Sequence, residues 1–512
     1  MKVIFNIKFR LLCCFKIINI LSSLRKLAGQ TAVYGLSSIL GRLLGYLLVP
    51  LYTRVLVESA YGSVVEMYSY MALLLIVLTY GMETAFFRFS ESTGKREKVF
   101  GTGLLSILTS SVVFLIFILL FSGNLADIIR YSTQPQYIIY LAFILFFDSI
   151  NTIPFANLRA ENKPKKFVAI KLTGIFVNIG LNLIFVILIP YIIENWQGGF
   201  SEFLQSFYRE NDKVSYIFIS NVISSGLMTL MFLPQLLKIK LHFDYAIWRK
   251  MIVYALPLLV FGLAGVVNEV LDRVLLKYLL PENIAMAQLG IYGACYKVSI
   301  IMTIFIQAYR YAAEPFFFAQ EQEKNAKETY AHLMNYFVMT TSIIFLATML
   351  YIDVVILFVG KPFREGVGIV PILLLANMFL GIYYNLSVWY KLTNKTKFGA
   401  YISLFGAIIT IGLNFYWIPR IGYMGSAWAT LICYGSMMVI SYFLGKKYYS
   451  IPYDWISILV MIGLSLGFYQ ISLLFHIETL WIKLLVNTLM LLVFLGILGV
   501  YQWKYVKTIV HK

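Results

Sequence analysis

The stretch NKPKKFVAIKLTGIFVNIGLNLIFVILIP, residues 162–190, occurs a second time in this chain as NKTKFGAYI…TIGLNFYWIP at residues 394–419. Asn162 aligns with Asn394, and the Ile-Gly-Leu-Asn run that ends at Asn182 recurs at the same offset, ending at Asn414. Each copy places a basic loop before an apolar helix that closes on Leu-Asn and Pro. A unit of this size encoded once in each half predicts two similar lobes.

Fainter echoes at similar spacing support the duplication. The pair Tyr61–Gly62 recurs as Leu289–Gly290, and the run 85–89 faces the run 314–318. In membrane proteins built from two such repeats, the binding site lies between them. We therefore expect a site at the interface of the two halves.

The composition identifies the class of protein. Hydrophobic residues make up 60% of the 512 residues, the mean hydropathy is +0.80, and 13% of the residues are charged. A soluble protein would have about 25% charged residues. Apolar windows of about 20 residues recur along nearly the whole chain, and ten-residue alternating strands are absent. The sequence predicts an all-α polytopic membrane protein with about 14 transmembrane helices, the first at 28–53 and the last at 479–502.

The net charge of +18 follows the expected topology. With both termini in the cytoplasm, cytoplasmic segments hold 28 of the 42 Lys and Arg residues, the opposite side holds 8, and 6 lie within helices. Basic residues are enriched in the cytoplasmic loops of membrane proteins. Topology thus accounts for the charge, and we expect no nucleic-acid partner.

The repeat and the spans divide the chain into four parts. Residues 1–27 form a basic cytoplasmic extension, either an interfacial helix or the result of a start codon assigned too far upstream. Residues 28–237 form an N-lobe of six spans, 238–446 a C-lobe of six spans, and 447–512 a final helix pair with a cytoplasmic tail. The outer loop 191–213 is an insertion relative to the second half. It is a lid, a contact for a sugar ligand, or a solvated loop without a role.

Ionisable residues inside the spans are the candidate functional residues, because a charge facing lipid near mid-bilayer costs about 2.5–3.5 kcal/mol. The seventh span has the densest set. Spacings of three and four residues place Glu269, Asp272 and Arg273 on one helix face, with Lys277 one turn further. Glu269 and Arg273 can form a structural ion pair, which would leave Asp272 to bind a cation or a proton.

Other spans add isolated charges. Arg42 in the first span and Lys297 in the eighth lie too deep to reach water readily. Buried cations in both lobes suit a polyanionic head group such as a pyrophosphate, which an arginine grips with two hydrogen bonds. Asp148 in the fourth span lines the same cavity or pairs with one of these cations. Three charges nearer the cytoplasmic boundary are expected to gate or to pair locally: Glu83, Arg88 and Arg310.

Motifs for enzymatic chemistry are absent from the sequence. It contains no GxxxxGK[ST] phosphate loop, no HExxH and no CxxC, and the four cysteines lack metal-ligand spacing. The loops are mostly shorter than about 20 residues, and 191–213 is the sole candidate for a catalytic segment. The 37 tyrosines suit interface belts, with stacking on sugars as the alternative. We expect a non-enzymatic protein with no metal or other cofactor.

Two N-terminal stretches carry a family resemblance: LAGQTAVYGLSSILGRLLGYLLVPLYTRVL (27–56) and AYGSVVEMYSYMALLLIVLTYGMETAFFRF (60–89). Together with the repeated Asn-Lys and Ile-Gly-Leu-Asn blocks, they resemble the Wzx-type polysaccharide flippases of the MOP (MATE-like) exporter superfamily. The resemblance covers about 28–505. It implies two six-helix lobes around a central cavity that opens alternately to either side of the membrane. The implied substrate is an undecaprenyl-pyrophosphate-linked oligosaccharide, moved across the bacterial inner membrane for O-antigen, capsule or exopolysaccharide synthesis.

The resemblance also implies residue roles. Arg42 matches a cavity arginine of the first helix, whereas Leu48 and Val49 replace the second arginine and the acid of MurJ-type lipid II flippases. The predicted roles are as follows: Arg42, Lys297, Arg273 and Asp148 for the substrate cavity, and Asp272 and Glu269 for coupling to an H⁺ or Na⁺ gradient or the membrane potential. Expected partners are the lipid-linked glycan, membrane lipids, and the polysaccharide polymerase and chain-length machinery. The alternatives are a MATE-type cation or drug exporter, a membrane glycan polymerase, and a lipid II flippase.

Overall fold

A computed structural model describes residues 39–510, apart from 42, 238–241 and 322. Every regular element in this part of the chain is a helix. The elements of the first half are, in order, α2 (Leu48–Val55), α3 (Glu58–Thr79), α4 (Met82–Thr93), α5 (Arg96–Ile128), α6 (Gln136–Ala160), α7 (Pro164–Leu183), η1 (Ile184–Leu188), α8 (Ile189–Asn195), α9 (Gly199–Phe207), η2 (Glu210–Asp212) and α10 (Lys213–Leu236).

The second half continues the same pattern. Its elements are α11 (Tyr245–Leu279), α12 (Glu282–Val298), α13 (Ile300–Gln320), α14 (Ala326–Leu350), α15 (Ile352–Val355), η3 (Ile356–Phe358), η4 (Lys361–Ile369), α16 (Val370–Leu386), α17 (Val388–Leu392), α18 (Lys397–Ile421), α19 (Tyr423–Tyr448), α20 (Trp455–Leu474) and α21 (Leu480–Val510).

The membrane character predicted from hydropathy is confirmed. Among the described residues, 12 helices are long and apolar enough to cross a membrane, and the bent pair α12–α13 raises the number to as many as 13. These match thirteen of the predicted spans in order. The remaining predicted span, 28–53, falls largely outside the described residues.

Aspartates begin three of the spans. The carboxylates of Asp212, Asp244 and Asp454 accept hydrogen bonds from backbone N–H groups in the first turn of α10, α11 and α20. These caps satisfy donors that a helix start leaves open. At Asp244 the bond from the N–H of Ile247 lowers the pKa of the carboxyl below its usual value, so this cap is ionised at neutral pH. The caps fix where the spans start.

The repeat seen in the sequence has the same backbone in both copies. Asn162 and Asn394 both have the left-handed φ of 54°, a conformation that asparagine tolerates better than most residues. The side-chain amide of Asn182 donates to the carbonyl of Asn178 at 2.8 Å, and that of Asn414 donates to the carbonyl of Thr410 at 2.7 Å. The offset of the repeat relates each of these positions to its counterpart.

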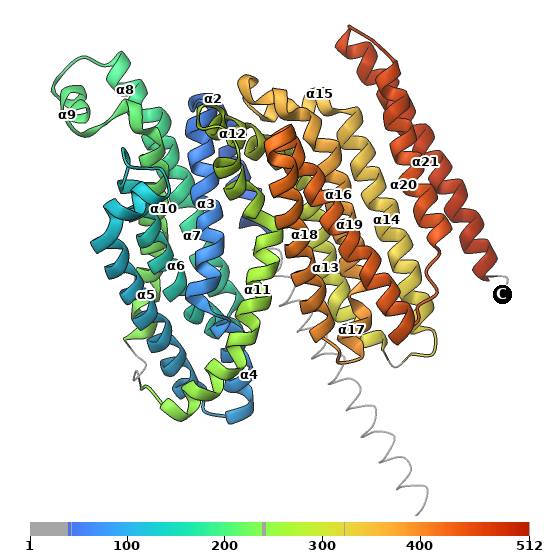
Figure 1. The fold of residues 1–512 in the computed structure, drawn as a ribbon, viewed down its shortest axis with the longest axis horizontal. Helices are drawn as coiled ribbons and strands as arrows, with labels where there is room; N and C mark the ends of the chain where they lie inside the picture. Colours follow the sequence, from blue (N-terminus) through green and yellow to red (C-terminus); the bar gives the residue numbers. More distant parts are fainter. Residues whose placement is uncertain (1–38, 42, 238–241, 322, 511–512) are drawn as a thin grey trace, which may run out of the picture.

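The helices form two groups, with α11 running between them (Figure 1). Near its start, α11 packs with the first group, because Met251 joins a buried cluster with Met82, Phe86 and Phe100. Further along, α11 packs against α18 of the second group. Helices α20 and α21 lie at the edge of the molecule, where α20 packs on α14. The domain boundary predicted at 237/238 precedes α11 and stays a prediction.

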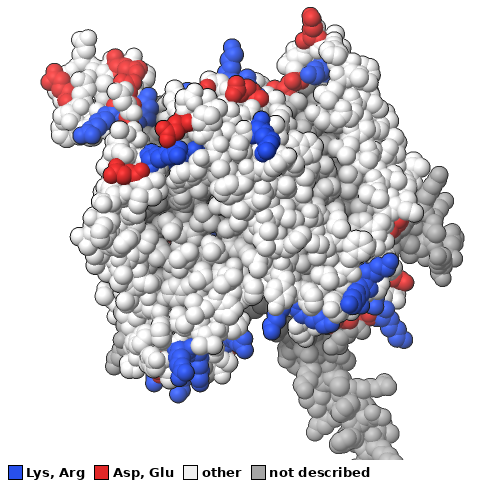
Figure 2. All heavy atoms as spheres, viewed as in Figure 1, with Lys and Arg blue, Asp and Glu red and all other residues white. Residues whose placement is uncertain are grey.

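Charged side chains gather at the two ends of the bundle, and the visible face between them is almost free of charge (Figure 2). One end carries mainly Lys and Arg; it includes the α4–α5, α6–α7 and α17–α18 connections, and we call it the basic end. The far end includes α2, α8, α9 and the start of α12 (Figure 1). A belt of this kind between two charged ends is typical of a multi-pass membrane protein.

Candidate substrate-binding cavity

A cavity of about 950 Å³ lies between the two groups of helices. Its walls come from α2, α3, α7 and α10 on one side and from α11–α13 and α16–α19 on the other. Lys391, Thr396 and Gly399 of the α17–α18 region line it, so the cavity reaches the basic end. It therefore lies at the interface between the halves, where the repeat predicts a binding site.

The charges in the cavity wall are mostly positive. Among the described lining residues, four are basic and one is acidic: Arg273, Lys297, Arg310 and Lys391 against Glu269. A net positive wall in a site enclosed by low-dielectric helices attracts anions and raises their local concentration. The geometry around each cation decides what it can bind.

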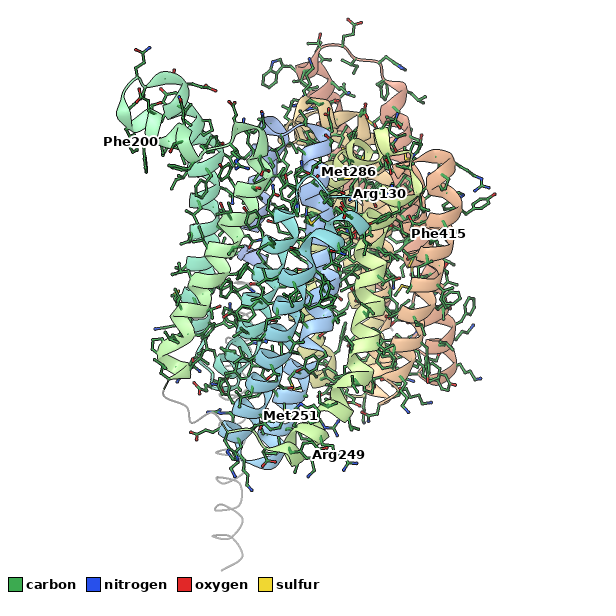
Figure 3. The ribbon with its side chains drawn as sticks, turned by 60° about the vertical axis from the view of Figure 1, so that its left-hand side comes forward. Arg130, Phe200, Arg249, Met251, Met286 and Phe415 are labelled. Carbon is green, nitrogen blue, oxygen red and sulfur yellow. The ribbon has the colours of Figure 1, made fainter. Side chains whose placement is uncertain are left out.

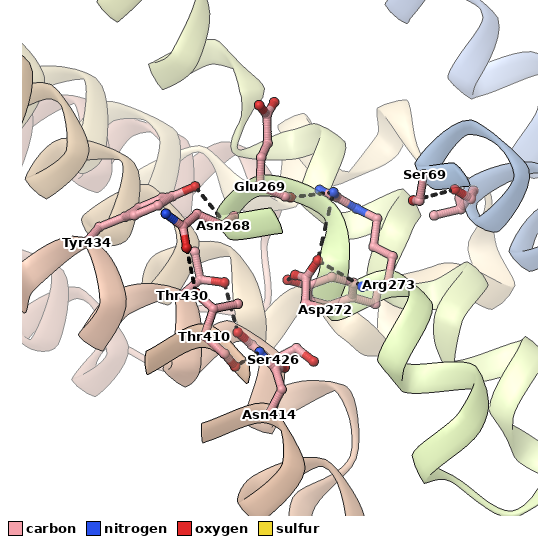
Figure 4. A network of polar contacts seen from close by, with 12 residues as sticks. Ser69, Asn268, Glu269, Asp272, Arg273, Thr410, Asn414, Ser426, Thr430 and Tyr434 are labelled. Carbon is pink, nitrogen blue, oxygen red and sulfur yellow. Dashed lines mark hydrogen bonds and ion pairs between the residues drawn. The ribbon is translucent and has the colours of Figure 1, made fainter. Parts of the chain in front are cut away.

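Arg273 is held by groups from two helices. Its Nη1 donates to the carbonyl oxygen of Glu269 at 2.6 Å, and its guanidinium carbon lies 4.2 Å from the ring centroid of Tyr296 on α12. The Asp272 carboxylate lies 3.9 Å from Nη1 and also accepts from the backbone N–H of Arg273 and from the hydroxyl of Tyr292. Figure 4 shows the contacts of Arg273 with Glu269 and Asp272. These contacts orient the guanidinium at the cavity wall.

The expected ion pair between Glu269 and Arg273 is replaced by one with Asp272. The Asp272 side chain is buried, and its oxygens are used by Arg273 and Tyr292. Glu269 is exposed in the cavity wall, and its carboxylate makes no hydrogen bond or ion pair with another described residue; Figure 4 shows it pointing away from Arg273. The two carboxylates thus exchange the positions predicted for them: Asp272 positions Arg273, and Glu269 faces the cavity.

Lys297 sits at a break between two helices. It is in the last turn of α12, and α12 meets α13 at an angle of 48° after Val298. The Lys297 Nζ lies 5.3 Å from the ring centroid of Tyr46, which also lines the cavity. Lys297 therefore lies near the middle of the bent span formed by α12 and α13, and its side chain lines the cavity. The sequence also places it far from either end of its span.

Arg310 and Lys391 share one carboxylate near the basic end. Glu314 Oε1 accepts from Lys391 Nζ at 2.8 Å and from Arg310 Nη2 at 3.4 Å. The guanidinium carbon of Arg310 lies 4.0 Å from the ring centroid of Tyr384. Arg310 was predicted as a gating residue, and the structure places it in the cavity wall. Sequence reasoning missed Lys391 because it was counted as a loop residue.

The remaining predicted residues lie elsewhere. Arg42 is outside the described residues, so its cavity position stays a prediction. Asp148 on α6 is not among the described lining residues, and its role toward the substrate stays a prediction. Glu83 forms an ion pair with Arg159 of α6, and the guanidinium carbon of Arg88 lies 4.3 Å from the ring centroid of Tyr254 on α11. Both Glu83 and Arg88 therefore have local partners near the basic end.

A buried polar network fixes the second half of α11 to the second lobe (Figure 4). The Asn268 amide donates to the carbonyl of Ser403 at 3.0 Å, and its oxygen accepts from Thr410 at 3.2 Å. The hydroxyl of Tyr434 donates to the Asn268 carbonyl at 3.4 Å. These bonds hold α11 against α18 and α19 at the residue that precedes Glu269. Within the described part of the chain, no group of three or more His, Cys, Asp or Glu residues is placed to hold a metal ion.

The lobes are joined at the far end. Gly62 on α3 faces α12 so closely that a Cβ on it would lie 2.1 Å from the carbonyl oxygen of Met286. A buried ion pair of 2.9 Å joins Lys277 of α11 to Glu66 of α3, and the hydroxyl of Tyr131 donates to the same carboxylate at 2.6 Å. Figure 3 shows Met286 and Arg130 at this end of the bundle, with Arg249 and Met251 near the other. The cavity thus reaches the basic end and is closed off from the far end.

Tyrosines form much of the cavity wall. Nine tyrosines from both lobes line it: Tyr46, Tyr52, Tyr61, Tyr68, Tyr296, Tyr383, Tyr384, Tyr390 and Tyr434. An aromatic ring offers a flat apolar face, and a tyrosine hydroxyl adds a hydrogen-bonding group. The wall can therefore contact the faces and hydroxyls of sugar rings while the cations hold an anion.

Comparisons with known proteins agree with this geometry. A family model described as "Polysaccharide biosynthesis protein" matches residues 27–321. No curated protein matches the chain significantly. A structure of the lipid II flippase MurJ in an inward closed conformation is similar with a TM-score of 0.66 and 16% identity, over 90% of this chain and 98% of that chain.

Two conformations of a MATE family transporter are similar as well. An inward-facing multidrug resistance MATE transporter of the MOP superfamily gives a TM-score of 0.63 at 13% identity, over 79% of this chain and 93% of that chain. An outward-facing MATE structure gives 0.57 at 13% identity, over 82% and 94%. At such identities these likenesses establish a shared fold.

Proposed function

Since the chain belongs to the polysaccharide biosynthesis protein family, we propose that it is a flippase for an undecaprenyl-pyrophosphate-linked oligosaccharide. It is not an enzyme: it carries the glycan from the cytoplasmic to the outer leaflet of the bacterial inner membrane. The product serves O-antigen, capsule or exopolysaccharide synthesis. Because Lys and Arg are enriched in cytoplasmic loops, the basic end of the bundle is cytoplasmic. Both termini then lie in the cytoplasm.

The single observation that carries this proposal is the chemistry of the cavity wall. Four cations against one carboxylate, among nine tyrosines, suit a ligand that joins a pyrophosphate to sugars. To an organic cation the same wall offers one lining carboxylate among the described residues, Glu269. This argues against the MATE-type drug exporter, although the folds are alike.

The cations divide into two groups along the substrate's path. Arg310 and Lys391 near the basic end meet the pyrophosphate first, in exchange for the Glu314 carboxylate that they share. Arg273 and Lys297 then hold it deeper, between the lobes. The exchange at Arg310 and Lys391 leaves neither cation without a counter-charge in the low-dielectric cavity. Arg42 of the first span, predicted for the same cavity, is expected to join the deeper group.

Transport requires the cavity to close at the basic end and to open at the far end. In the state described, the far end is joined by Gly62 and by the Lys277–Glu66 pair, while the cavity reaches the cytoplasmic end. Substrate binding shifts the equilibrium only through contacts that differ between the two states. A gradient of H⁺ or Na⁺ supplies the drive through Glu269, the carboxylate that faces the cavity, and Asp272 serves to position Arg273. The released glycan passes to the polysaccharide polymerase and chain-length machinery.

Depletion of the protein in cells tests the proposal. We expect the lipid-linked oligosaccharide to accumulate on the cytoplasmic face of the membrane, with loss of surface polysaccharide. An intermediate that still reaches the outer face unpolymerised would contradict flipping and assign the protein to a later assembly step. Unchanged glycan with altered sensitivity to cationic drugs would favour the exporter, and arrested peptidoglycan synthesis would favour lipid II as the substrate.

A further inference from the structure

Helix α9 in the long far-end loop carries an exposed aromatic face. Phe200, Phe203 and Phe207 recur at spacings of three and four residues, so they share one side of the helix. Their side chains are 59%, 62% and 48% exposed. The rings of Phe203 and Phe207 lie 5.3 Å apart, centroid to centroid. Three neighbouring phenylalanines left this open need a partner that the described chain does not supply.

Another side of α9 is packed against other parts of the chain, and this packing turns the phenylalanine face outward. Ser201 and Leu204 are buried, as is Tyr208, which follows the helix, and α9 packs on α8. The Tyr208 hydroxyl donates to the carbonyl of Phe185 at 2.9 Å, and its ring stacks on Tyr216 with centroids 4.7 Å apart. Packing of α9 on α8, together with the contacts of Tyr208 with η1 and α10, therefore fixes the orientation of the phenylalanine face.

The polar residues of α9 occupy the remaining arc. At 100° per residue, Gln205 lies about 160° from Phe203 around the helix, and Glu202 and Ser206 flank the same polar side. The helix thus has one side on the bundle, one apolar side and one polar side. Such a pattern is typical of a helix that lies in the plane of a membrane interface.

The apolar side continues a surface that already faces lipid. The span Pro164–Asn195 exposes Ile187 and Leu188 near its far end, and Tyr191 and Trp196 follow with 56% and 61% exposed. Tyrosine and tryptophan are enriched where a membrane span meets water. Figures 1 and 3 show α8 and α9 projecting sideways from the far end, with Phe200 on the outer side of this projection.

We infer that α9 is a membrane-surface anchor that lies in the head-group region of the far leaflet, with its phenylalanine face in lipid. The occupant is phospholipid, because the phenylalanine face continues the exposed apolar surface of the span Pro164–Asn195. The anchor fixes how deep the far ends of the two helices α7 and α10 lie in the membrane. This inference is independent of the transported substrate.

Spin labels on the full-length protein in phosphatidylethanolamine–phosphatidylglycerol vesicles test the anchor. Single cysteines are introduced as Phe203→Cys and Gln205→Cys after replacement of the four native cysteines, and collisions with O₂ and with a water-soluble Ni²⁺ chelate are measured. We expect the O₂ to Ni²⁺ collision ratio to be several-fold higher at position 203 than at position 205. The pair Phe200→Cys and Ser206→Cys provides the same contrast if one variant is lost to misfolding.

Two results would overturn the inference. High Ni²⁺ accessibility at both positions would show a solvated loop. Low accessibility to both reagents at position 203 would show that protein or another chain segment covers the face. A ratio that alternates with helix position is expected only from a helix lying at the lipid boundary.

Discussion

Gly62 and Gly290 occupy reciprocal positions in the contact between the lobes. A Cβ on Gly62 would lie 2.1 Å from the carbonyl oxygen of Met286, and a Cβ on Gly290 would lie 2.0 Å from the carbonyl oxygen of Glu58. The offset that relates the two glycines also relates Glu58 to Met286. The repeat thus places one glycine on each side of a backbone-to-backbone contact between α3 and α12, and a side chain on either would force the helices apart.

Gly290→Ala is expected to open the far end. Overpacking at a close contact costs about 1–3 kcal/mol, and here the cost falls only on the state in which α3 and α12 touch. The population should therefore shift towards far-end-open conformations. Distances between spin labels at exposed Val57 and Ile284, on opposite sides of this contact, would report the shift.

The matched control is Gly412→Ala. A Cβ at Gly412 meets nothing within 4 Å, so the distance distribution should stay that of the unsubstituted protein. An unchanged distribution in Gly290→Ala as well would show that the contact does not close the far end.

Lys277→Met is expected to destabilise the same end through Glu66. Both side chains are buried, and loss of the lysine leaves a carboxylate without its counter-charge, which costs about 3–5 kcal/mol. Replacing both residues, as Glu66→Gln with Lys277→Met, should restore most of the loss. Apparent melting temperatures of the two single variants and the double variant give the coupling. A loss in the double variant equal to the sum of the two single losses would mean that the pair contributes no coupling.

Arg273→Lys is expected to lower glycan export at least about tenfold, equivalent to about 1.4 kcal/mol. Lysine keeps the charge but not the planar fork that binds a phosphate through two hydrogen bonds. Export is measured as surface polysaccharide per amount of protein in the membrane. Arg420→Ala, an arginine outside the described cavity wall, should export normally. Full export from Arg273→Ala would exclude this residue from the substrate's path.

Glu314→Gln is expected to tighten binding of the lipid pyrophosphate. The carboxylate competes with the phosphate for Lys391 and Arg310, and a partly exposed pair of this kind is worth about 0.2–1 kcal/mol. We therefore expect Kd to fall by no more than about fivefold. A carboxylate near the basic end of the first lobe, Glu83, pairs with Arg159 outside the described cavity wall, so Glu83→Gln should leave Kd unchanged. Weaker binding in Glu314→Gln would contradict the competition.

The sequence was sufficient for the spans and the repeat because their signals are local. Apolar windows and basic loops predicted thirteen spans that the structure contains. The structure confirms the alignment of Asn162 with Asn394, because both residues have the same left-handed φ. The same offset also relates Arg159 to Lys391, so the repeat aligns the cavity lysine missed from the sequence with an arginine of the first half.

The roles of the site residues could not be predicted from the sequence, because they depend on contacts between helices that residue spacing along one helix does not reveal. Glu269 and Asp272 share a helix face with Arg273, and the hydroxyl of Tyr292 on α12 belongs to the contacts that hold Asp272 in the buried position. Glu66 was not singled out because its partner Lys277 lies 211 residues away. Asp148 has the depth of a cavity residue but is not among those described in the wall.

Translocation by the purified protein tests flipping most directly. Vesicles containing an undecaprenyl-pyrophosphate oligosaccharide are prepared with and without the protein, and a glycan-cleaving enzyme is added outside. We predict that the protein makes nearly all of the glycan accessible to the enzyme, while vesicles with Arg273→Ala keep about half protected, as expected for a lipid distributed equally between two leaflets that do not exchange. Protection of half the glycan in vesicles with the unsubstituted protein would contradict the proposed function.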